Sequence, residues 1–569
     1  AQGCGSRQLC PDGMLRVTVA LQVVVAAIAK KPNFVIVFGD DWGWGDLGAN
    51  DVAAKGLTDN LDRLAQSGVR FTDFHVGASV CTPSRAALLT GRIGLRTGVV
   101  NNFGPSSLFG LPRNETTIAE FLSAHGYRTG MIGKWHLGTY PGYHPSDRGF
   151  ASYVGVPYSI DMGCGASPTS TMAPLNDNNT MFCSACQTNG EPVPFCNPDP
   201  SCGRSNGCAF FDIGLPLFNN RTIVEQPANL DSLSEKYDAA IHEFISNAAA
   251  SSEPFFLYFA ASHVHVPQNH AKRWENYSTT SFAMRANGGL EFAAALLEMD
   301  HSVGEIVRAL DEAGVTNDTV IMVTGDNGPW ECKCNLTGSA GPFQGLWQKA
   351  NGGDSSGKFS VWEGGHRVVG IITWPSHVKS AVSTALVSSM DFFPTIAGIA
   401  NLPMPADGRH YDGVSLWPLL SGADSTEQAR TTLFHPASVA CDAQHPGSII
   451  AARNRNLKAI WVTGGIAGCG GQRSQCIVHK EPLIFDLEVD PVEESPFNAS
   501  THPNLSAIIH EFESLRSAYM DDVDSGVITI TSFAEGAAGR AINCCNDENA
   551  ACACSSHSES TVSPGVYDI

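Results

Sequence analysis

Three short, uninterrupted apolar runs constrain the fold of this 569-residue chain more than any other feature of its sequence. The runs are Asn33–Phe38, Pro254–Ala261 and Thr319–Thr324. They are rich in β-branched and aromatic residues, which is typical of strands buried on both faces. Helical patterns lie between them, at Leu57–Gly68 and Gly289–Ala313. Strands that alternate with helices predict an α/β fold with a large, mostly parallel central sheet flanked by helices.

The pattern changes after about Thr431, where short β-like runs follow one another closely. These runs are Ser448–Ala452, Leu457–Val462 and Leu483–Leu487, and a helical pattern follows near Leu505–Tyr519. They predict a small antiparallel sheet and a helix. We therefore expect an upstream segment with a signal peptide (1–29), a catalytic domain (30–430) and a smaller C-terminal domain with a Cys-rich tail (431–569).

The N-terminal region has the pattern of a secretion signal. Arg16 precedes an apolar run from Val17 to Ala29, which ends in Ala27-Ile28-Ala29 before two lysines. A basic residue, a short apolar run and a small-x-small site together predict a signal peptide. The run is too short to span a bilayer, and no later stretch reaches about 18 uninterrupted apolar residues. We therefore expect no transmembrane segment.

Cysteines and glycosylation sequons also indicate export. Six of the 18 cysteines crowd residues 164–208, and this Cys-rich insertion should be internally disulfide-bonded. Zinc is the alternative for Cys183 and Cys186, but no second pair stands at ligand spacing. Cys4 and Cys10 lie before the mature chain, and Cys81 belongs to the motif described below. When these three are set aside, the number of remaining cysteines is odd, so one thiol should be free.

Eight Asn-x-Ser/Thr sequons favour a glycoprotein of an oxidising lumen, lysosomal or extracellular. They begin at Asn114, Asn178, Asn220, Asn276, Asn317, Asn335, Asn498 and Asn504.

The charge balance excludes one class of partner. The formal net charge is -21 and the pI is about 5.2. A protein that binds nucleic acid needs a basic face for the phosphates, so we expect no nucleic-acid partner.

The strongest local motif begins at Cys81 and reads Cys-Thr-Pro-Ser-Arg-Ala-Ala-Leu-Leu-Thr-Gly-Arg. Pro83 suits the first turn of a helix, and Thr82 is a candidate cap. Cys81 should therefore lie at a helix N-terminus, where free N–H groups favour anions, with Arg85 adding a fixed charge. Read alone, Cys81 could equally be a buried structural cysteine or a thiolate nucleophile with a lowered pKa.

Two polar pairs follow predicted strands and form a candidate metal site. Asp40 and Asp41 follow the first strand, and Asp326 and Asn327 follow the third. They offer only oxygen ligands, which suit Ca²⁺ or Mg²⁺ and not zinc. Adjacent aspartates can reach one ion only if the chain turns there, and flanking glycines permit a turn. A solvated acidic turn is the commoner fate of one such pair, but two pairs at strand ends favour a metal site.

Two basic pairs have a spacing of two residues. Lys134 and His136 would lie on one side of an extended backbone, with Trp135 on the other. His263 and His265 repeat the spacing after the Pro254–Ala261 run. Read alone, each histidine would more often be a core or surface residue.

Together these motifs resemble the signature of the type I sulfatases, in which the motif cysteine becomes formylglycine. The Cys81 motif is accompanied, in the family's order, by Gly39-Asp40-Asp41, Gly133-Lys134-Trp135-His136-Leu137-Gly138, Asp326-Asn327-Gly328-Pro329 and Trp362-Glu363-Gly364-Gly365. The phrases FTDF and GVPYS and the Cys544-Cys545 cluster are most similar to the arylsulfatase A group. The resemblance covers nearly the whole chain after the signal peptide. It implies an alkaline-phosphatase/sulfatase-like α/β fold.

The resemblance also assigns roles to residues. It implies catalytic roles for Cys81, Arg85, Lys134, His136, His265 and Lys358, substrate contacts for Lys134, Ser159, His265 and Lys358, and metal ligands at Asp40, Asp41, Cys81, Asp326 and Asn327. His263 has no counterpart among the catalytic positions. The segment between Asp326 and Lys358 departs from the family pattern, with Cys332, Cys334 and several glycines. The implied cofactors are one Ca²⁺ per chain, with Mg²⁺ as the alternative, and formylglycine made from Cys81.

The mechanism implied is hydrolysis of a sulfate ester through a covalent sulfo-enzyme intermediate. Hydrated formylglycine at position 81 attacks sulfur, and His265, with Lys358, assists the departing alcohol. His136 then takes a proton from the second hydroxyl, and sulfate is expelled. The implied partners are a sulfated small molecule, lipid or glycan and the formylglycine-generating enzyme, and a homo-oligomer is left open.

Three rival interpretations are open at this point. A phosphatase or phosphodiesterase of the same superfamily would have Thr or Ser in place of Cys81. A pseudoenzyme that only binds sulfated glycans should have lost a metal or basic position, and none is missing. A structural disulfide-rich glycoprotein would not need the two polar pairs at strand ends.

Overall fold

The computed structural model describes most of the chain that follows the predicted signal peptide. The described residues are 31–105, 107–163, 182–188, 191–194, 215–226, 228–251, 253–274, 289–353, 355–423, 428–437, 448–468 and 474–526. The predicted signal peptide, most of the Cys-rich insertion and the Cys-rich tail lie outside them. The predictions of cleavage and of internal disulfides at 164–208 therefore stay predictions.

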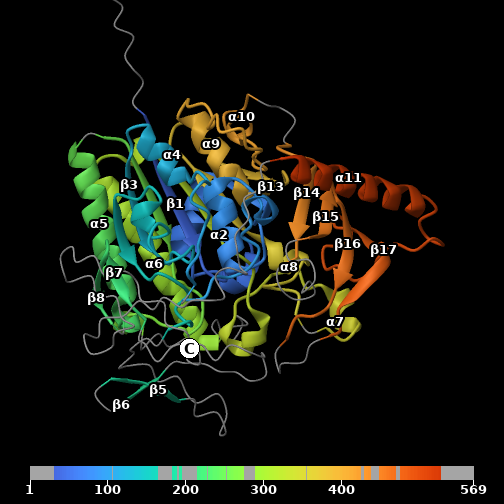
Figure 1. Ribbon diagram of the computed structural model, residues 1–569, viewed down its shortest axis with the longest axis horizontal. Coiled ribbons are helices and arrows are strands. Elements are labelled where there is room, and N and C mark those ends of the chain that lie inside the picture. The colour runs from blue at the N-terminus through green and yellow to red at the C-terminus, as the bar shows by residue number, and fades with distance from the viewer. Residues whose placement is uncertain are drawn as a thin grey trace, which may run out of the picture. The chain divides into compact units, whose positions relative to one another are not determined.

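The main sheet, in which Figure 1 labels β1 and β3, is mixed, with a parallel centre and antiparallel flanks. Its strand order is β12-β2-β11-β10-β1-β9-β3-β4-β7-β8, and β13 also pairs with β2. The bounds are β1 Asn33–Gly39, β2 Val69–His75, β3 Arg128–Gly133, β4 Ser152–Gly155, β7 Leu217–Asn219, β8 Thr222–Glu225, β9 Phe255–Ala260, β10 Thr319–Gly325, β11 Arg367–Thr373, β12 Ala381–Ser383 and β13 Val387–Ser388. Strand β1 lies at the centre and pairs in parallel with both β9 and β10.

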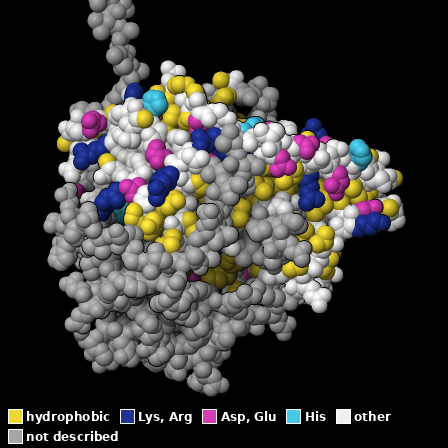
Figure 2. Space-filling view, in the orientation of Figure 1, with side chains coloured by type: hydrophobic (Ala, Val, Ile, Leu, Met, Phe, Trp, Pro, Cys, Tyr) yellow, Lys and Arg dark blue, Asp and Glu magenta, His cyan; other side chains and the backbone are white. Residues whose placement is uncertain are grey.

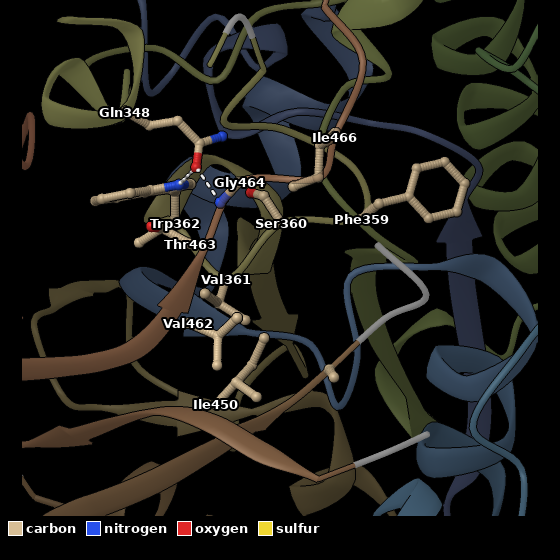
Figure 3. A pocket seen from close by; sticks show the side chains of 11 residues that line it. Gln348, Phe359, Ser360, Val361, Trp362, Ile450, Val462, Thr463, Gly464 and Ile466 are labelled. Carbon is tan, nitrogen blue, oxygen red and sulfur yellow. Dashed lines mark hydrogen bonds between the residues drawn. The ribbon is translucent and has the colours of Figure 1, made fainter. Parts of the chain in front are cut away.

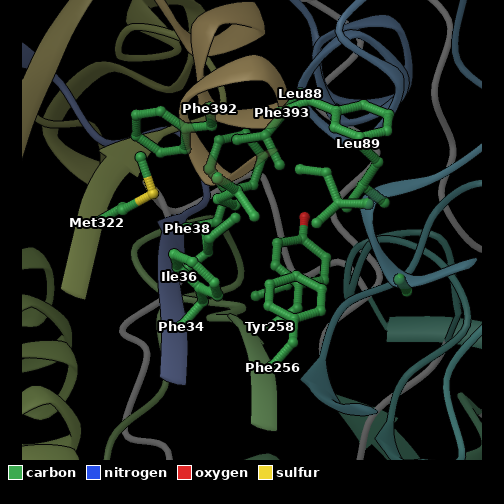
Figure 4. Packing of buried hydrophobic residues seen from close by; sticks show 14 of the residues in the cluster. Phe34, Ile36, Phe38, Leu88, Leu89, Phe256, Tyr258, Met322, Phe392 and Phe393 are labelled. Atoms are coloured by element: carbon green, nitrogen blue, oxygen red, sulfur yellow. The ribbon is translucent and has the colours of Figure 1, made fainter. Parts of the chain in front are cut away.

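Helices cover both faces of this sheet, as the continuous apolar strands require. On β1, Phe34, Ile36 and Phe38 pack on one face, and Val35 and Val37 pack on the other. Figure 4 shows the first face, where these aromatic side chains meet residues of α2 and α9. The helices on this face are α2 Cys81–Thr90, α4 Ile118–Ala124, α9 Phe392–Ile399 and α10 Trp417–Leu420; those on the other are α1 Asp59–Ser67, α5 Leu233–Ser251 and α6 Gly289–Glu312.

A second, antiparallel sheet lies in the same compact unit, which begins at Pro32. Its order is β14-β15-β16-β17, with bounds Thr432–Pro436, Ile449–Asn454, Leu457–Thr463 and Ile477–Asp486. Helix α11, Leu505–Ser525, packs on it through Phe512. The remaining elements are short: α3 Gly94–Thr97, α7 Leu346–Ala350, α8 Glu363–His366, and a hairpin of β5 Phe182–Thr188 and β6 Glu191–Pro194.

These elements confirm the predicted fold class. All three apolar runs are strands, and the C-terminal runs form the antiparallel sheet. Thr117 and Glu120 form a capping box at the start of α4. The antiparallel strands β2 and β11, which flank the parallel centre, were not predicted.

Two surface findings complete the description. On the face shown in Figure 2, Lys and Arg side chains are interspersed with Asp and Glu among the described residues. No described helix has the length and apolarity to cross a bilayer.

Candidate active site

The two polar pairs meet because β1 and β10 are parallel and in register. Gly39 of β1 lies beside Gly325 of β10, so the residues that follow them emerge at the same edge. The backbone N–H of Asp41 donates to Asp326 Oδ1 at 3.0 Å, and Asn327 Nδ2 donates to Asp41 Oδ1 at 2.7 Å. Asp41 itself makes the turn, with φ of 55°, a left-handed conformation that Asp tolerates better than most residues. Asp40, Asp41, Asp326 and Asn327 are all buried.

Cys81 is the first residue of α2, as predicted, and its thiol faces this edge. Its Sγ lies 3.7 Å from Asp40 Oδ1, and it is the free cysteine of the described residues. Burial raises the pKa of the thiol, although the nearby charges of Lys134 and Lys358 act to lower it. The prediction that Thr82 caps the helix is wrong. Val80 is the cap residue, and the Thr82 hydroxyl donates to the carbonyl of His136 at 2.9 Å.

Three basic side chains surround the carboxylates. Lys134 Nζ donates to both oxygens of Asp40, at 2.7 and 2.9 Å. Arg85 donates to Asp326 Oδ2 at 2.8 and 3.1 Å and lies 3.2 Å from Asp40. Lys358 Nζ donates to Asp41 Oδ1 at 2.6 Å. Three carboxylates and three cations therefore balance within a buried volume.

This pairing sets the charge state of the site. Burial alone would raise the pKa of Asp40, but Lys134, His265 and Arg85 outweigh it and hold the pKa at about 2. The pKa of Asp326 is raised, by burial and by the negative charge of Asp40. Burial would lower the pKa of Lys358, yet the charge of Asp41 raises it. Lys358 and Arg85 thus stay charged beside the carboxylates.

His265 lies in the same cluster, beside Lys358, with a ring nitrogen within 4.8 Å of ligand atoms of Asp40, Asp41 and Cys81. Its Nε2 is 3.2 Å from Lys358 Nζ, 3.4 Å from Asp41 Oδ2 and 3.5 Å from the hydroxyl of Ser159. His263 is bonded elsewhere, with its Nε2 3.0 Å from Asn269 Oδ1. The structure therefore places His265 and Ser159 in the cluster and His263 outside it.

His136 has a backbone that differs from the predicted extended one. Its φ is 59°, so the rule of alternating sides fails at this residue. Its Nε2 lies 3.0 Å from the carbonyl of Phe103, and its buried Nδ1 has no partner in the described part of the chain. Burial lowers the pKa of His136, and Lys134 and Arg85 lower it further, so the imidazole is neutral and able to accept a proton.

Two further residues border the site, and neither was singled out from the sequence. The Trp330 ring lies 5.6 Å from the ring of His265 and 4.6 Å from Lys358 Nζ. Asp161 has a buried oxygen without a partner among the described residues. Burial would raise its pKa, but His265 and a bond from Ser159 lower it. Their sequence signal is weak: Trp330 follows the Asp326-to-Pro329 motif, and Asp161 follows Ser159 by two residues.

The residues present fit a hard divalent cation. Asp40 and Asp41 form, with Cys81 and His265, a group of side chains that could hold a metal ion. Asp326 and Asn327 are hydrogen-bonded to Asp41, and the buried Oδ1 of Asn327 has no hydrogen-bond partner in the described residues. A divalent cation would add positive charge to a site whose charges already balance. A site with that excess suits an anionic ester.

Comparisons with known proteins agree with this geometry. The Sulfatase family matches residues 32–402, and the C-terminal region of aryl-sulfatase matches residues 428–554. Human arylsulfatase G is 42% identical, over 92% of this chain and 93% of its own length. Human arylsulfatase A is 36% identical, over 82% of this chain and 83% of its own. The PsFucS1 sulfatase from Pseudoalteromonas sp. has the same fold, with a TM-score of 0.69, 23% identity and coverage of 88% and 92% of the two chains.

This α/β fold, with acidic, basic and thiol side chains at the carboxyl edge of its sheet, is that of the sulfatases, and the chain belongs to the sulfatase family. Within the family it is an arylsulfatase-type sulfatase, and it hydrolyses sulfate esters.

Proposed function

We propose that this sulfatase uses formylglycine made from Cys81 as its nucleophile, in a site that binds Ca²⁺. The observation that carries the proposal is the position of the Cys81 thiol. It is buried at the start of α2 and lies 3.7 Å from Asp40 Oδ1, and Lys134 donates to that same carboxylate. An oxygen at this position would meet both the oxygen ligands and the basic groups that receive a sulfate.

The four oxygen-bearing residues Asp40, Asp41, Asp326 and Asn327 would hold the cation, together with the modified side chain of residue 81. Their hard donors favour Ca²⁺, with Mg²⁺ as the alternative. When bound, the cation supplies positive charge that stabilises a deprotonated hydroxyl and the sulfuryl oxygens.

The basic residues then divide the reaction between them. A hydroxyl of hydrated residue 81 attacks sulfur, and the S–O bond to the leaving alcohol breaks. Lys134 and Lys358 offset charge on the sulfuryl oxygens. His265, within 3.2 Å of Lys358 and 3.5 Å of Ser159, gives a proton to the departing oxygen.

Release of sulfate requires a base, and His136 is placed for this role. Its neutral, unpartnered Nδ1 accepts the proton of the second hydroxyl of residue 81. The aldehyde re-forms as the C–O bond to sulfate breaks. Arg85, held by Asp326 and Asp40, orients residue 81 from the same helix.

We also propose that the enzyme works in the lysosome or outside the cell, on a sulfated small molecule, lipid or glycan. Disulfide-bonded Cys332, Cys334 and Cys476 support an oxidising compartment. Five sequon asparagines are exposed and accessible to glycosylation: Asn114, Asn220, Asn317, Asn498 and Asn504. The formylglycine-generating enzyme would be a partner during biosynthesis.

Mass spectrometry and a turnover panel test the proposal together. Protein made in a host that contains the converting enzyme should carry an aldehyde at residue 81 and about one Ca²⁺ per chain. It should hydrolyse aryl sulfates and leave the matching aryl phosphates largely untouched. Fully active protein with an unmodified thiol at Cys81 would refute the assignment.

A further inference from the structure

The side chains assigned to the chemistry are almost completely buried. At most 3% of the surface is exposed in each of Cys81, Lys134, His265 and Lys358. Because these groups are buried, the sulfate has to enter between them while the larger alcohol of the ester stays at the border of the site. The side chains at that border therefore decide which sulfate esters are accepted.

Two aromatic side chains form the border beside Lys358 and His265. Trp330 and Phe359 are partly exposed, and their rings meet edge to face, with centroids 6.0 Å apart. The centroid of the Trp330 ring lies 5.6 Å from that of His265 and 4.6 Å from Lys358 Nζ. Lys358 Nζ is also 5.7 Å from the centroid of the Phe359 ring. We call Trp330 and Phe359 the aromatic rim.

The aromatic rim lies on the side from which the alcohol departs. His265 is the residue proposed to give a proton to the leaving oxygen, so the atom bonded to that oxygen has to lie close to the His265 ring and hence to Trp330. Asp161, a further partly exposed residue at the border, carries a carboxylate. A charged carboxylate that is covered by an apolar ring loses its water without gaining a partner. A ring in the leaving alcohol is therefore expected against the aromatic rim and not against Asp161.

The backbone places one of these rings in an unfavourable conformation. Phe359 has a φ of 73°, in the left-handed region that bulky residues rarely adopt. Two hydrogen bonds hold the turn, from the Lys358 N–H to the Pro329 carbonyl at 2.9 Å and from the Phe359 N–H to the Ser79 carbonyl at 2.8 Å. Glycine would adopt this φ without strain. A bulky ring that is kept at such a position, next to Lys358, points to a use for the ring itself.

The apolar surface of the rim is not used for core packing. Neither Trp330 nor Phe359 belongs to a hydrophobic core cluster of the described residues. Phe359 borders a small cavity of about 20 Å³, which Ser360 and Trp362 also line. Figure 3 shows that its ring points away from these two neighbours. Both rings are thus placed to contact a molecule that approaches Lys358 and His265.

We propose that the aromatic rim binds a ring in the leaving alcohol, so that this enzyme hydrolyses sulfate esters of ring-bearing alcohols in preference to those of open-chain alcohols. Offset or edge-to-face contacts between the substrate ring and the two aromatic side chains supply the selectivity. The inference rests on the proposed function, because it takes the leaving oxygen to lie beside His265.

Two sulfate esters with matched leaving groups test the rim. Phenyl sulfate carries a ring, whereas the sulfate ester of a fluorinated open-chain alcohol with the same pKa as phenol carries none. The matched pKa makes bond cleavage about equally demanding in the two esters. We expect the wild-type kcat/KM to be at least about tenfold higher for phenyl sulfate. Equal values for the two esters, or a preference for the open chain, would overturn the proposal without any variant.

Phe359→Ala and Trp330→Ala each remove one ring. Each variant should raise the KM for phenyl sulfate by about fivefold and leave kcat nearly unchanged, because a ring contact is made in the ground state as well as in the transition state. The kinetics with the open-chain ester should change by less than about twofold. The control Phe497→Ala removes a partly exposed ring that is stacked on His502, and it should behave as the wild type with both esters.

A merely structural role of the rim predicts a different result. If the two rings only hold Lys358 and His265 in place, their removal lowers kcat for both esters in equal proportion, and that outcome would refute the proposal. Phe359→Gly checks the backbone, since glycine adopts the observed φ without strain; it should lose the preference for phenyl sulfate as Phe359→Ala does. If Trp330→Ala does not fold, Trp330→Leu keeps apolar bulk and serves as the alternative variant.

Failure of the rim can be told apart from failure of the proposed function. The comparison uses the ratio of two rates in active protein, and this ratio does not depend on which group of residue 81 attacks sulfur. An unmodified thiol at Cys81 would be seen by mass spectrometry and would leave the ester ratio interpretable. A correct formylglycine assignment with an unchanged ester ratio in both ring variants would refute the rim alone.

Discussion

Asp41 shows how much a single residue contributes to this site. Its backbone N–H donates to Asp326, and its carboxylate accepts from Asn327 and Lys358. Its left-handed φ of 55° lets it do so directly after Asp40. Neighbouring aspartates on an extended strand would point to opposite faces. The turn at Asp41 therefore brings carboxylate oxygens of two adjacent residues within 4.8 Å of each other, where we propose that they bind the cation.

Replacement of Cys81 by serine should trap the enzyme after one turnover. A serine hydroxyl can attack sulfur, but it lacks the second hydroxyl from which His136 would take a proton. We expect the variant to become covalently sulfated on residue 81 and to stall, with kcat reduced at least about 1,000-fold. Intact-mass measurement after incubation with substrate would detect the added sulfate. Sustained turnover, or an unmodified serine in substrate-saturated protein, would contradict the two-hydroxyl mechanism.

Asp326→Asn should separate metal binding from folding. The amide can still accept the hydrogen bond from the Asp41 N–H, but the charge that pairs with Arg85 and serves the cation is lost. We expect metal occupancy and kcat to fall by at least about 100-fold, with native far-UV circular dichroism. Elemental analysis and kinetics measure both. The exposed acid Asp311 provides a control, since Asp311→Asn should change neither. Normal metal content in Asp326→Asn would show that the cation lies elsewhere.

At the scale of the element, helix α4 depends on its capping box. The Thr117 hydroxyl accepts from the Glu120 N–H at 3.0 Å and donates to the Arg148 carbonyl at 3.0 Å. Thr117→Ala should lower the free energy of unfolding by about 1 kcal/mol, as measured by urea denaturation. Thr117→Ser keeps the hydroxyl and should recover most of the loss. Equal stability of all three proteins would show that the box contributes nothing.

The same local rules explain which elements were predictable. The central strands β1, β9 and β10 are continuously apolar because helices cover both faces of the sheet. This pattern can be recognised in the sequence alone. Strand β2 mixes Arg70, Thr72 and Asp73 with apolar residues, and it pairs antiparallel with β11 about 300 residues away. Such a pairing leaves no local pattern, so the flanks of the sheet were missed.

The candidate site likewise contains residues that the sequence motifs predict and features that depend on the fold. The residues predicted as metal ligands and basic groups stand in or near short motifs, so they could be proposed from the sequence alone. The positive φ of His136, the bond from Thr82 to its carbonyl and the contact of Trp330 with His265 arise from packing between distant segments.

At the scale of the whole molecule, buried ion pairs join the two sheets. Lys458 of β16 contacts Glu363 of α8 and Glu493, and its surface is 0% exposed. Lys458→Met would leave two buried acids without this partner, and removal of one member of a buried pair costs about 3–5 kcal/mol. We expect a loss of this order in urea unfolding.

A second change provides the control for this prediction. Glu363 keeps its ion pairs with Arg453 and Arg367 in Lys458→Met. Glu493→Gln in the same background removes the charge of the other acid and should recover part of the loss. If the single Lys458→Met variant were as stable as the wild type, the packing of the small sheet against α8 would not depend on these charges.

The burial of Cys81 also limits the period during protein synthesis in which its thiol is accessible. Its thiol is buried, and the charges of Lys358 and Asp326 act on it; a ribosome adds both of these residues long after residue 81. At about 5–20 residues per second, the interval is on the order of tens of seconds. During it the thiol sits on a chain whose central strand has no β9 or β10 to pair with. The oxidation proposed for Cys81 would therefore take place most easily while the nascent chain is incomplete, because the completed fold buries the thiol.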